Sequence, residues 1–389
     1  MNIKSITIGG WFQRTTLHLT EVYSFFAGKD LIGLDKKILQ KNLKTLSVQK
    51  FERVSDEIEY IEVSLKNNLR LKITEDGLIT LKQELNTSDL KLLKTEIEKI
   101  KSFYENNLAT SISYIFSRGA PVPKELAKIE NVYPFILELE SESEGVKKDR
   151  FIKEIFEKLN DVANSKITEG NISVFKGKKV MVIQNIKDMF DVFAETEIFF
   201  REFKTQMARY LHIHREIWEK IKVIKEKESI RGKDILKIRE ELQEEGKTIT
   251  LIEARINQMP TYLKTRQKLT DLTQTHKDLQ PLFQYKFETL LDTHDYIKSL
   301  WSMTKNYLNS ANETFSVLQT ESTKSSISSL TIITTIGVVA GLINYMVRDT
   351  YPKITYVGII YFGVLLFLTF LVNMGVVYLY KYKSYKLKK

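Results

Sequence analysis

Two long uncharged apolar runs near the C-terminal end constrain this chain most strongly. Residues 330–347 read LTIITTIGVVAGLINYMV, and residues 354–380 form a longer run rich in Ile, Leu, Phe and Val. About 20 predominantly apolar residues span the hydrocarbon core of a bilayer as a helix. The sequence therefore predicts two transmembrane helices. The alternative, a buried hairpin in a soluble core, does not need runs so long and so free of charge.

The short polar link between the two runs, residues 348–353, fixes their relative direction. Helices joined by so few residues run antiparallel, which places both ends of this pair on one side of the membrane. Residues 381–389 carry five lysines, and the positive-inside rule assigns such a tail to the cytoplasm. The first residues alternate polar and apolar side chains without a secretory signal. We expect a multi-pass protein of the inner (plasma) membrane with both termini in the cytoplasm.

The first apolar run differs from the second because one of its faces is small and polar. Steps of three or four residues define that face as Thr323, Ser326, Leu330, Thr334, Gly337, Gly341 and Asn344. In lipid, such residues either let helices pack closely or line water, because an exposed amide is costly in hydrocarbon. We interpret the face as the wall of a pore formed by several copies, with close helix packing as the alternative. Arg348, Asp349 and Lys353 would then lie at its outer mouth.

A long helical stalk is predicted ahead of the first apolar run. Apolar residues recur at spacings of three, four and seven from Pro260 to Thr323, which is typical of a helix that packs against others. No Gly or Pro separates the stalk from the first run, so we expect one continuous helix. Pro260 is expected to begin it, and Pro281 either kinks it or begins a new helix. Helical segments at 188–226 and 233–257 are expected to form an antiparallel hairpin.

The first part of the chain has a different texture, with polar and apolar residues in alternation. The pattern predicts strands at 3–8, 60–65, 69–74, 78–82, 133–139 and across 174–184, and helices at 89–104 and 148–159. The fold class is therefore an α+β cytoplasmic domain, then a long α-helical stalk and two C-terminal transmembrane helices. The expected boundaries are 1–185 for the α/β domain, 186–258 for the hairpin, 259–329 for the stalk, 330–347 and 354–380 for the spans, and 381–389 for the basic tail.

No catalytic constellation stands out in the sequence. The chain has no cysteine, which excludes disulfides, thiolate metal sites and a cysteine nucleophile. His212 and His214 lie two residues apart on a helix, on nearly opposite faces, while His276 and His294 are expected to be hydrogen-bonded or solvated in the stalk. The glycine pair at 9–10 lacks the further glycine and lysine of a phosphate-binding loop. We expect neither an enzyme nor a metal centre.

Aromatic and cationic residues come together in two segments that are candidates for a ligand site. The candidate residues are Trp11, Arg14 and His18 in the first segment, and Lys147, Lys148 and Arg150 in the second. An indole ring offers a base a flat surface, a guanidinium binds phosphate bidentately, and the start of a helix adds partial positive charge. The alternatives are a half-buried strand end and a solvated charge run. The net charge of +10 suits anionic lipid or a phosphorylated ligand, but Lys and Glu are interleaved, so no direct nucleic-acid binding is expected.

The succession of an α/β domain, a stalk helix, two spans and a lysine-rich tail resembles the CorA family of divalent-cation channels. Residues 330–336 look like the start of that family's first span. The resemblance implies a homopentamer. The family ends this span with Gly-Met-Asn, whose asparagine forms the ion-selecting ring, whereas the nearest approach here is 341–344, which lacks the spacing. The outer link offers two cationic side chains against one acidic one, which would repel a divalent cation, so magnesium uptake does not follow from the resemblance.

The opening segment 6–21, ITIGGWFQRTTLHLTE, is similar to a divergent branch of CorA-like proteins associated with type III CRISPR systems. That resemblance implies a membrane effector switched on by a nucleotide messenger, an S-adenosylmethionine-AMP conjugate. The leading hypothesis is a ligand-gated homopentameric channel in antiviral defence, whose partners are membrane lipid, copies of itself and a small nucleotide. A divalent-cation transporter with altered selectivity and a pore-less membrane-tethered scaffold are the alternatives.

Overall fold

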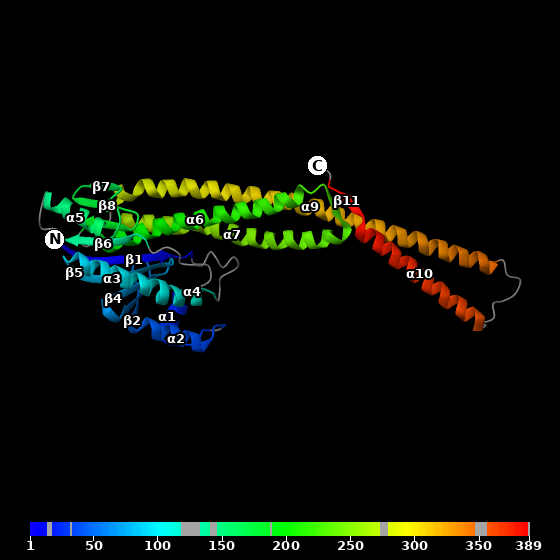
Figure 1. The fold of residues 1–389 in the computed structure, drawn as a ribbon, viewed down its shortest axis with the longest axis horizontal. Coiled ribbons are helices and arrows are strands. Elements are labelled where there is room, and N and C mark those ends of the chain that lie inside the picture. The colour runs from blue at the N-terminus through cyan, green and yellow to red at the C-terminus, as the bar shows by residue number, and fades with distance from the viewer. Residues whose placement is uncertain are drawn as a thin grey trace. The chain divides into compact units, whose positions relative to one another are not determined.

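The computed structural model describes residues 1–13, 18–31, 33–117, 133–140, 146–186, 189–272, 279–346 and 356–387. The chain divides into two compact units. The first unit comprises Met1–Leu211 and Leu251–Lys298, and the second comprises His212–Thr250 and Ser299–Lys389. Three long helices have parts in both units. Each unit is described by itself, with the labels of Figure 1.

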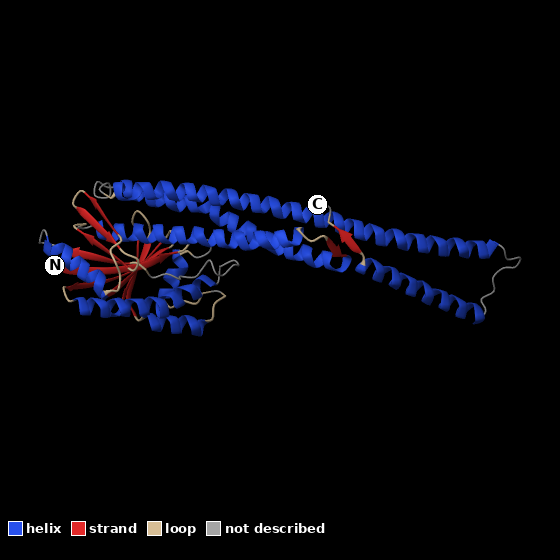
Figure 2. Cartoon of the chain, turned by 45° about the horizontal axis from the view of Figure 1, so that its top comes forward, coloured by secondary structure: helices blue, strands red, loops and turns tan. Residues whose placement is uncertain are grey.

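The first unit is built on a nine-stranded sheet, drawn in red in Figure 2. Its strands are β1 Asn2–Trp11, β2 Val48–Val54, β3 Tyr60–Leu65, β4 Leu69–Thr74, β5 Leu78–Thr87, β6 Phe135–Glu140, β7 Ser165–Glu169, β8 Ile172–Lys176 and β9 Val180–Gln184. Their spatial order is β2-β3-β4-β5-β1-β6-β9-β8-β7. The β6–β9 pair is parallel and the other pairs are antiparallel. The N-terminal α/β domain that the sequence predicts is thus confirmed.

Glycines allow two close features of this sheet. Gly77 adopts φ +89° in the turn between β4 and β5, where its N–H donates to the Thr74 carbonyl at 3.0 Å. A side chain at Gly9 would place its Cβ 2.2 Å from the carbonyl oxygen of Ile79 on β5. Only glycine fits such an approach. The glycine pair at 9–10 therefore lies within β1, where it serves strand packing.

Five helices of the described residues lie between these strands along the chain. They are α1 Leu19–Phe26, α2 Lys36–Leu46, α3 Leu90–Phe103, α4 Ala109–Ser117 and α5 Val146–Lys158, with a 3₁₀ turn at Lys66–Asn68 and a π turn at Tyr104–Leu108. Their apolar residues join one core with alternate sheet residues such as Ile6, Leu71 and Leu137, all fully buried. The opposite face of the sheet carries Lys72 and Lys82, which pair with Glu195 and Asp191 of the helix that follows β9.

Four long helices follow the sheet in the described part of the chain. They are α6 Phe190–Lys225, α7 Gly232–Leu272, α9 Gln280–Met346 and α10 Tyr356–Tyr382. The prediction that the stalk and the first apolar run form one helix is confirmed from Gln280 onward, since α9 continues for 67 residues to Met346. Pro281 lies in the first turn of α9, where its missing N–H costs nothing. Of the two alternatives for this proline, the start of a new helix is correct.

We expected from the sequence that Pro260 begins the stalk helix, but this proline lies inside α7. An interior proline leaves the carbonyl four residues earlier without its N–H donor. Here that carbonyl, on Ile256, lies 2.7 Å from Nε2 of His294. The buried imidazole of α9 therefore donates the missing hydrogen bond, which allows α7 to pass through Pro260.

In the second unit, a two-stranded ribbon ties the chain after α10 to the turn between α6 and α7. Its strands are β10 Ser229–Arg231 and β11 Ser384–Lys386, paired antiparallel. The N–H of Gly232 donates to the Lys383 carbonyl at 3.0 Å, and the N–H of Leu387 donates to the Glu228 carbonyl at 3.2 Å. The end of α10 is thereby attached to the helical hairpin ahead of α9. This ribbon was not predicted from the sequence.

Candidate functional site

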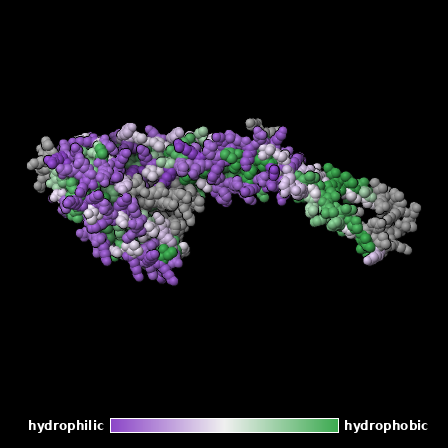
Figure 3. All heavy atoms as spheres, in the orientation of Figure 1, coloured by the Kyte–Doolittle hydropathy of each residue, from purple (hydrophilic) through white to green (hydrophobic). Residues whose placement is uncertain are grey.

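The second unit contains apolar helical segments whose side chains are exposed among the described residues. Among the described residues, one helix, Gln280–Gly341, is long and apolar enough to cross a membrane by length and composition, and Leu366–Tyr382 is a shorter apolar helix. No part of the most apolar window of the longer helix is buried. Figure 3 shows hydrophobic residues gathered on the C-terminal parts of α9 and on α10. The end of the longer helix overlaps the first apolar run of the sequence, and the shorter helix overlaps the second.

Part of the polar face predicted for the first run can be located on α9. Thr323, Thr334, Gly337 and Gly341 are exposed and Leu330 is partly exposed; we call these five residues the α9 stripe. A Cβ added at either glycine meets no atom within 4 Å. The Thr334 hydroxyl donates to the Leu330 carbonyl, so this threonine is satisfied in lipid as well as in water. The stripe is therefore open to a neighbouring helix.

The remaining residues of the predicted pore lie outside the described part of the chain. They are Arg348, Asp349 and Lys353, together with the side chains of Ser326 and Asn344. At the N-terminal end of the stripe, Thr323 borders a hollow of about 610 Å³ that Arg239 and Lys324 also line. The structure thus brings a small polar stripe and two cationic side chains to one stretch of α9.

Trp11, predicted to stack on a ligand base, belongs to the protein core. Its ring stacks on Phe203 with the centroids 5.7 Å apart and meets Phe199 and Tyr262 edge-on. Its indole N–H donates to the Asp76 carbonyl at 2.8 Å. This packing leaves the ring no open face for a base, which corrects the prediction.

The other predicted ligand residues do not form a common site where they are described. His18 precedes α1, and its backbone N–H donates to the Glu21 carboxylate, while Arg14 lies outside the described residues. The helix α5 begins at Val146, so Lys147, Lys148 and Arg150 lie in its first turns and not before them. The side chains of both lysines are outside the description. Arg150 is exposed and pairs with Glu154 at 3.0 Å, as in an ordinary solvated helix.

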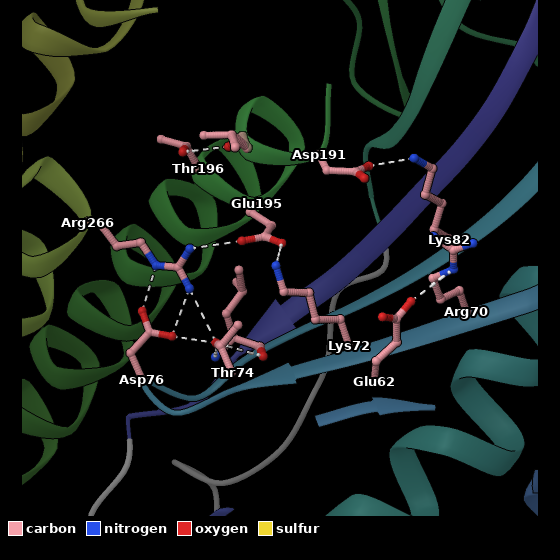
Figure 4. A network of polar contacts seen from close by, with 12 residues as sticks. Glu62, Arg70, Lys72, Thr74, Asp76, Lys82, Asp191, Glu195, Thr196 and Arg266 are labelled. Carbon is pink, nitrogen blue, oxygen red and sulfur yellow. Dashed lines mark hydrogen bonds and ion pairs between the residues drawn. The ribbon is translucent and has the colours of Figure 1, made fainter. Parts of the chain in front are cut away.

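A site that we did not predict is centred on the buried guanidinium of Arg266 in α7 (Figure 4). Its Nε and Nη2 donate to the two carboxylate oxygens of Asp76, at 2.6 and 2.7 Å, and its Nη1 donates to Glu195 at 3.1 Å. Burial alone would raise the pKa of Asp76, but the charge and hydrogen bonds of Arg266 hold that pKa below its ordinary value. The bidentate pair fixes the β4–β5 turn against α7 and α6.

The sheet face beside Arg266 carries further ion pairs, seen in Figure 4 between β3, β4, β5 and α6. They are Lys72 with Glu195 at 2.6 Å, Lys82 with Asp191 at 2.6 Å, and Arg70 with Glu62 at 3.0 Å. Two hollows of about 140 and 280 Å³ open between these side chains and share Tyr60, Lys72 and Glu195. Within the described residues, no group of three or more His, Cys, Asp or Glu side chains could hold a metal ion. We call Arg70, Lys72 and Lys82 the cationic patch.

One feature of the sequence indicates part of this site. The predicted strands 69–74 and 78–82 flank a tight Gly77 turn, and counting residues outward from that turn pairs Arg70 with Lys82, as observed. Two like charges directly opposite one another on adjacent strands are unfavourable without an anion nearby. The carboxylates and the guanidinium supplied by α6 and α7 carry no such signal, because they come from more than 100 residues away in the chain.

No model of a protein family matches the chain, and no curated protein matches its sequence.

Proposed function

We propose that this protein is a membrane channel, formed by several copies of the chain and opened by a ligand of its α/β domain. The observation that carries the proposal is the continuity of α9. One unbroken helix of 67 residues begins packed against α6 of the first unit, where Phe283 and Phe287 meet Phe200, and ends in an exposed apolar segment. In such a channel, the α9 stripe lines the pore, α10 faces lipid, and a CorA-like pentamer is the assembly that the family resemblance favours. A rigid helix transmits a change at one end to the other without an intermediate hinge.

The ligand must stabilise the open arrangement over the closed one. A ligand with equal affinity for both states would not change their populations. Changing the ratio of open to closed channels from 1:99 to 99:1 takes about 10⁴-fold tighter binding to the open state. We propose a nucleotide second messenger, with a role in type III CRISPR defence. The resemblance of residues 6–21 supports this identity and this role.

Flux from liposomes containing the purified full-length protein tests the proposal. We expect ions to cross only when a nucleotide ligand is present. Gly337→Leu should reduce the flux at least tenfold because a bulky side chain on the stripe fills the pore. The matched control is Gly375→Leu in α10, where an added Cβ also meets no atom within 4 Å, and this variant should conduct normally.

Two results would favour other functions. Flux of divalent cations without any nucleotide would indicate a transporter with altered selectivity. No conductance under any ligand, from protein that is correctly inserted, would indicate a pore-less scaffold.

A further inference from the structure

The register of the sheet brings three cations of the first unit together on one face. Arg70 on β4 lies directly opposite Lys82 on β5, and Lys82 lies opposite Thr7 on β1. In the next row with the same orientation, Lys72 lies opposite Thr80. Cross-strand neighbours have Cβ atoms about 4.5–5.5 Å apart, and like charges at that distance repel. The three cations of the cationic patch therefore favour negatively charged groups at this point of the sheet.

Carboxylates that differ in their exposure to solvent supply this negative charge. Glu195, which pairs with Lys72 and Arg266, has a side chain that is only 11% exposed. Asp191, which pairs with Lys82, is 54% exposed in the first turn of α6. Arg70 is itself 53% exposed and pairs with Glu62 at 3.0 Å and with Glu84 at 3.7 Å. Asp191 can turn toward water at little cost because exposed ion pairs contribute about 0–1 kcal/mol, whereas Glu195 is held in place.

A second observation points to a ligand at the same place. The Thr7 hydroxyl is buried and has no hydrogen-bond partner among the described residues. Thr7 lines the hollow of about 140 Å³ together with the cationic patch and Asp191. A buried hydroxyl without a partner costs about 1–3 kcal/mol. A ligand oxygen that reached this hydroxyl would recover that cost.

We propose that this hollow binds the phosphoryl group of a small phosphorylated molecule, with the Asp191 carboxylate as its internal competitor. The phosphoryl oxygens replace Asp191 on Lys82, accept two hydrogen bonds from the Arg70 guanidinium, and accept a hydrogen bond from the Thr7 hydroxyl. The adjoining hollow of about 280 Å³, which Tyr60 also borders, leaves room for the remainder of the molecule. The role of this site in gating rests on the proposed function, whereas phosphate binding itself does not require a pore.

Displacement of Asp191 gives the ligand a direct effect on a long helix. Asp191 is the second residue of α6, and its bond to Lys82 is one of the contacts that hold the start of this helix against the sheet. When phosphate takes the place of this carboxylate, that contact is lost. The start of α6 is then free to shift relative to β5.

Titration calorimetry of the full-length protein in detergent, with inorganic phosphate, AMP and adenosine as probes, tests the site. We expect AMP and phosphate to bind and adenosine not to bind. Tighter binding of AMP than of phosphate indicates a nucleotide ligand, and equal binding indicates free phosphate. Asp191→Asn should bind the anionic probes about tenfold more tightly because the competing carboxylate is gone. Lys82→Gln should bind them at least tenfold more weakly.

The control is Lys36→Gln, which removes an exposed cation at the start of α2 that pairs with the exposed Asp30. Its affinity should not change, and a melting curve for each variant verifies that it is folded. Binding of adenosine as tight as that of AMP, or equal affinities in the Asp191 and Lys82 variants, would overturn the site. If that happens while nucleotide-dependent flux persists, the channel stands without this site. Phosphate binding without flux under any ligand would instead support the site and overturn the channel.

Discussion

At the scale of single residues, Pro260 and His294 show how a helix tolerates an interior proline. The His294 imidazole supplies the hydrogen bond that Pro260 denies to the Ile256 carbonyl. His294→Ala should lower the free energy of unfolding by about 1–3 kcal/mol, because it leaves a buried carbonyl unsatisfied. In a Pro260→Ala background the helix regains its own N–H donor, so the same substitution should cost clearly less.

Thermal unfolding of the two single variants and the double variant measures this coupling as a double-mutant cycle. His212→Ala is the control, since this histidine has an exposed side chain that pairs with Glu216 on its own helix. Its change should stay within about 0.5 kcal/mol. An equal cost of His294→Ala in both backgrounds would show that the imidazole only fills space.

The same pair shows where sequence reasoning ends at this scale. Proline has a strong local preference for the first turn of a helix, which explains our expectation for Pro260. That preference is overcome by a donor 38 residues away in the chain, which no local pattern reveals. The burial of Trp11 has a similar origin, because the rings that enclose it come from α6 and α7.

At the scale of elements, the predictability of each strand follows its burial. The strands β3 and β4 have the predicted bounds because their residues alternate between core and surface. The strands β2 and β7, at the two edges of the sheet, were missed. Every residue of β7 is exposed and no residue of β2 is fully buried. Without a buried face, a strand has no apolar alternation to detect. The hairpin of β4 and β5 was detectable, but the α6 and α7 residues that complete the candidate site were not.

The β10–β11 ribbon makes a prediction at this scale. A Cβ at Gly232 would lie 2.5 Å from the Tyr380 carbonyl oxygen at the end of α10, and backbone cannot move aside cheaply. Gly232→Ala should therefore detach the ribbon, and the amides of β11 and Leu387 should exchange with solvent about tenfold faster or more. Hydrogen exchange measured by mass spectrometry tests this.

Gly246→Ala is the matched control for the ribbon. It lies in the same helix, α7, and its added Cβ would meet only the flexible Leu308 side chain at 3.2 Å. This variant should leave exchange at β11 unchanged and stabilise the helix slightly, because alanine favours helix over glycine by about 1 kcal/mol. Unchanged protection of β11 in Gly232→Ala would mean that the ribbon is not held by this close approach.

At the scale of the whole molecule, the exposed apolar helices require a partner. Side chains such as Ile336 on α9 and Phe367 on α10 are more than 60% exposed in the single chain. A soluble monomer rarely exposes a contiguous apolar patch of more than a few hundred Å². Lipid covers such a surface, and so do further copies of the chain. The small and polar residues of the α9 stripe suit an inward face shared by several copies of α9, whereas α10 carries bulky side chains suited to lipid.

This assignment can be tested with single cysteines, because the chain has none of its own. Gly341→Cys places a thiol on the stripe, and Val339→Cys places one two residues away on the opposite side of the helix. If copies of α9 surround one axis with the stripe inward, mild oxidation in the membrane should cross-link the first variant and spare the second. Native mass spectrometry should then give a single multiple of 45.4 kDa, which the family resemblance predicts to be five. Cross-linking of Val339→Cys alone would show that the stripe faces away from the axis. The bulky face of α9 would then line any pore.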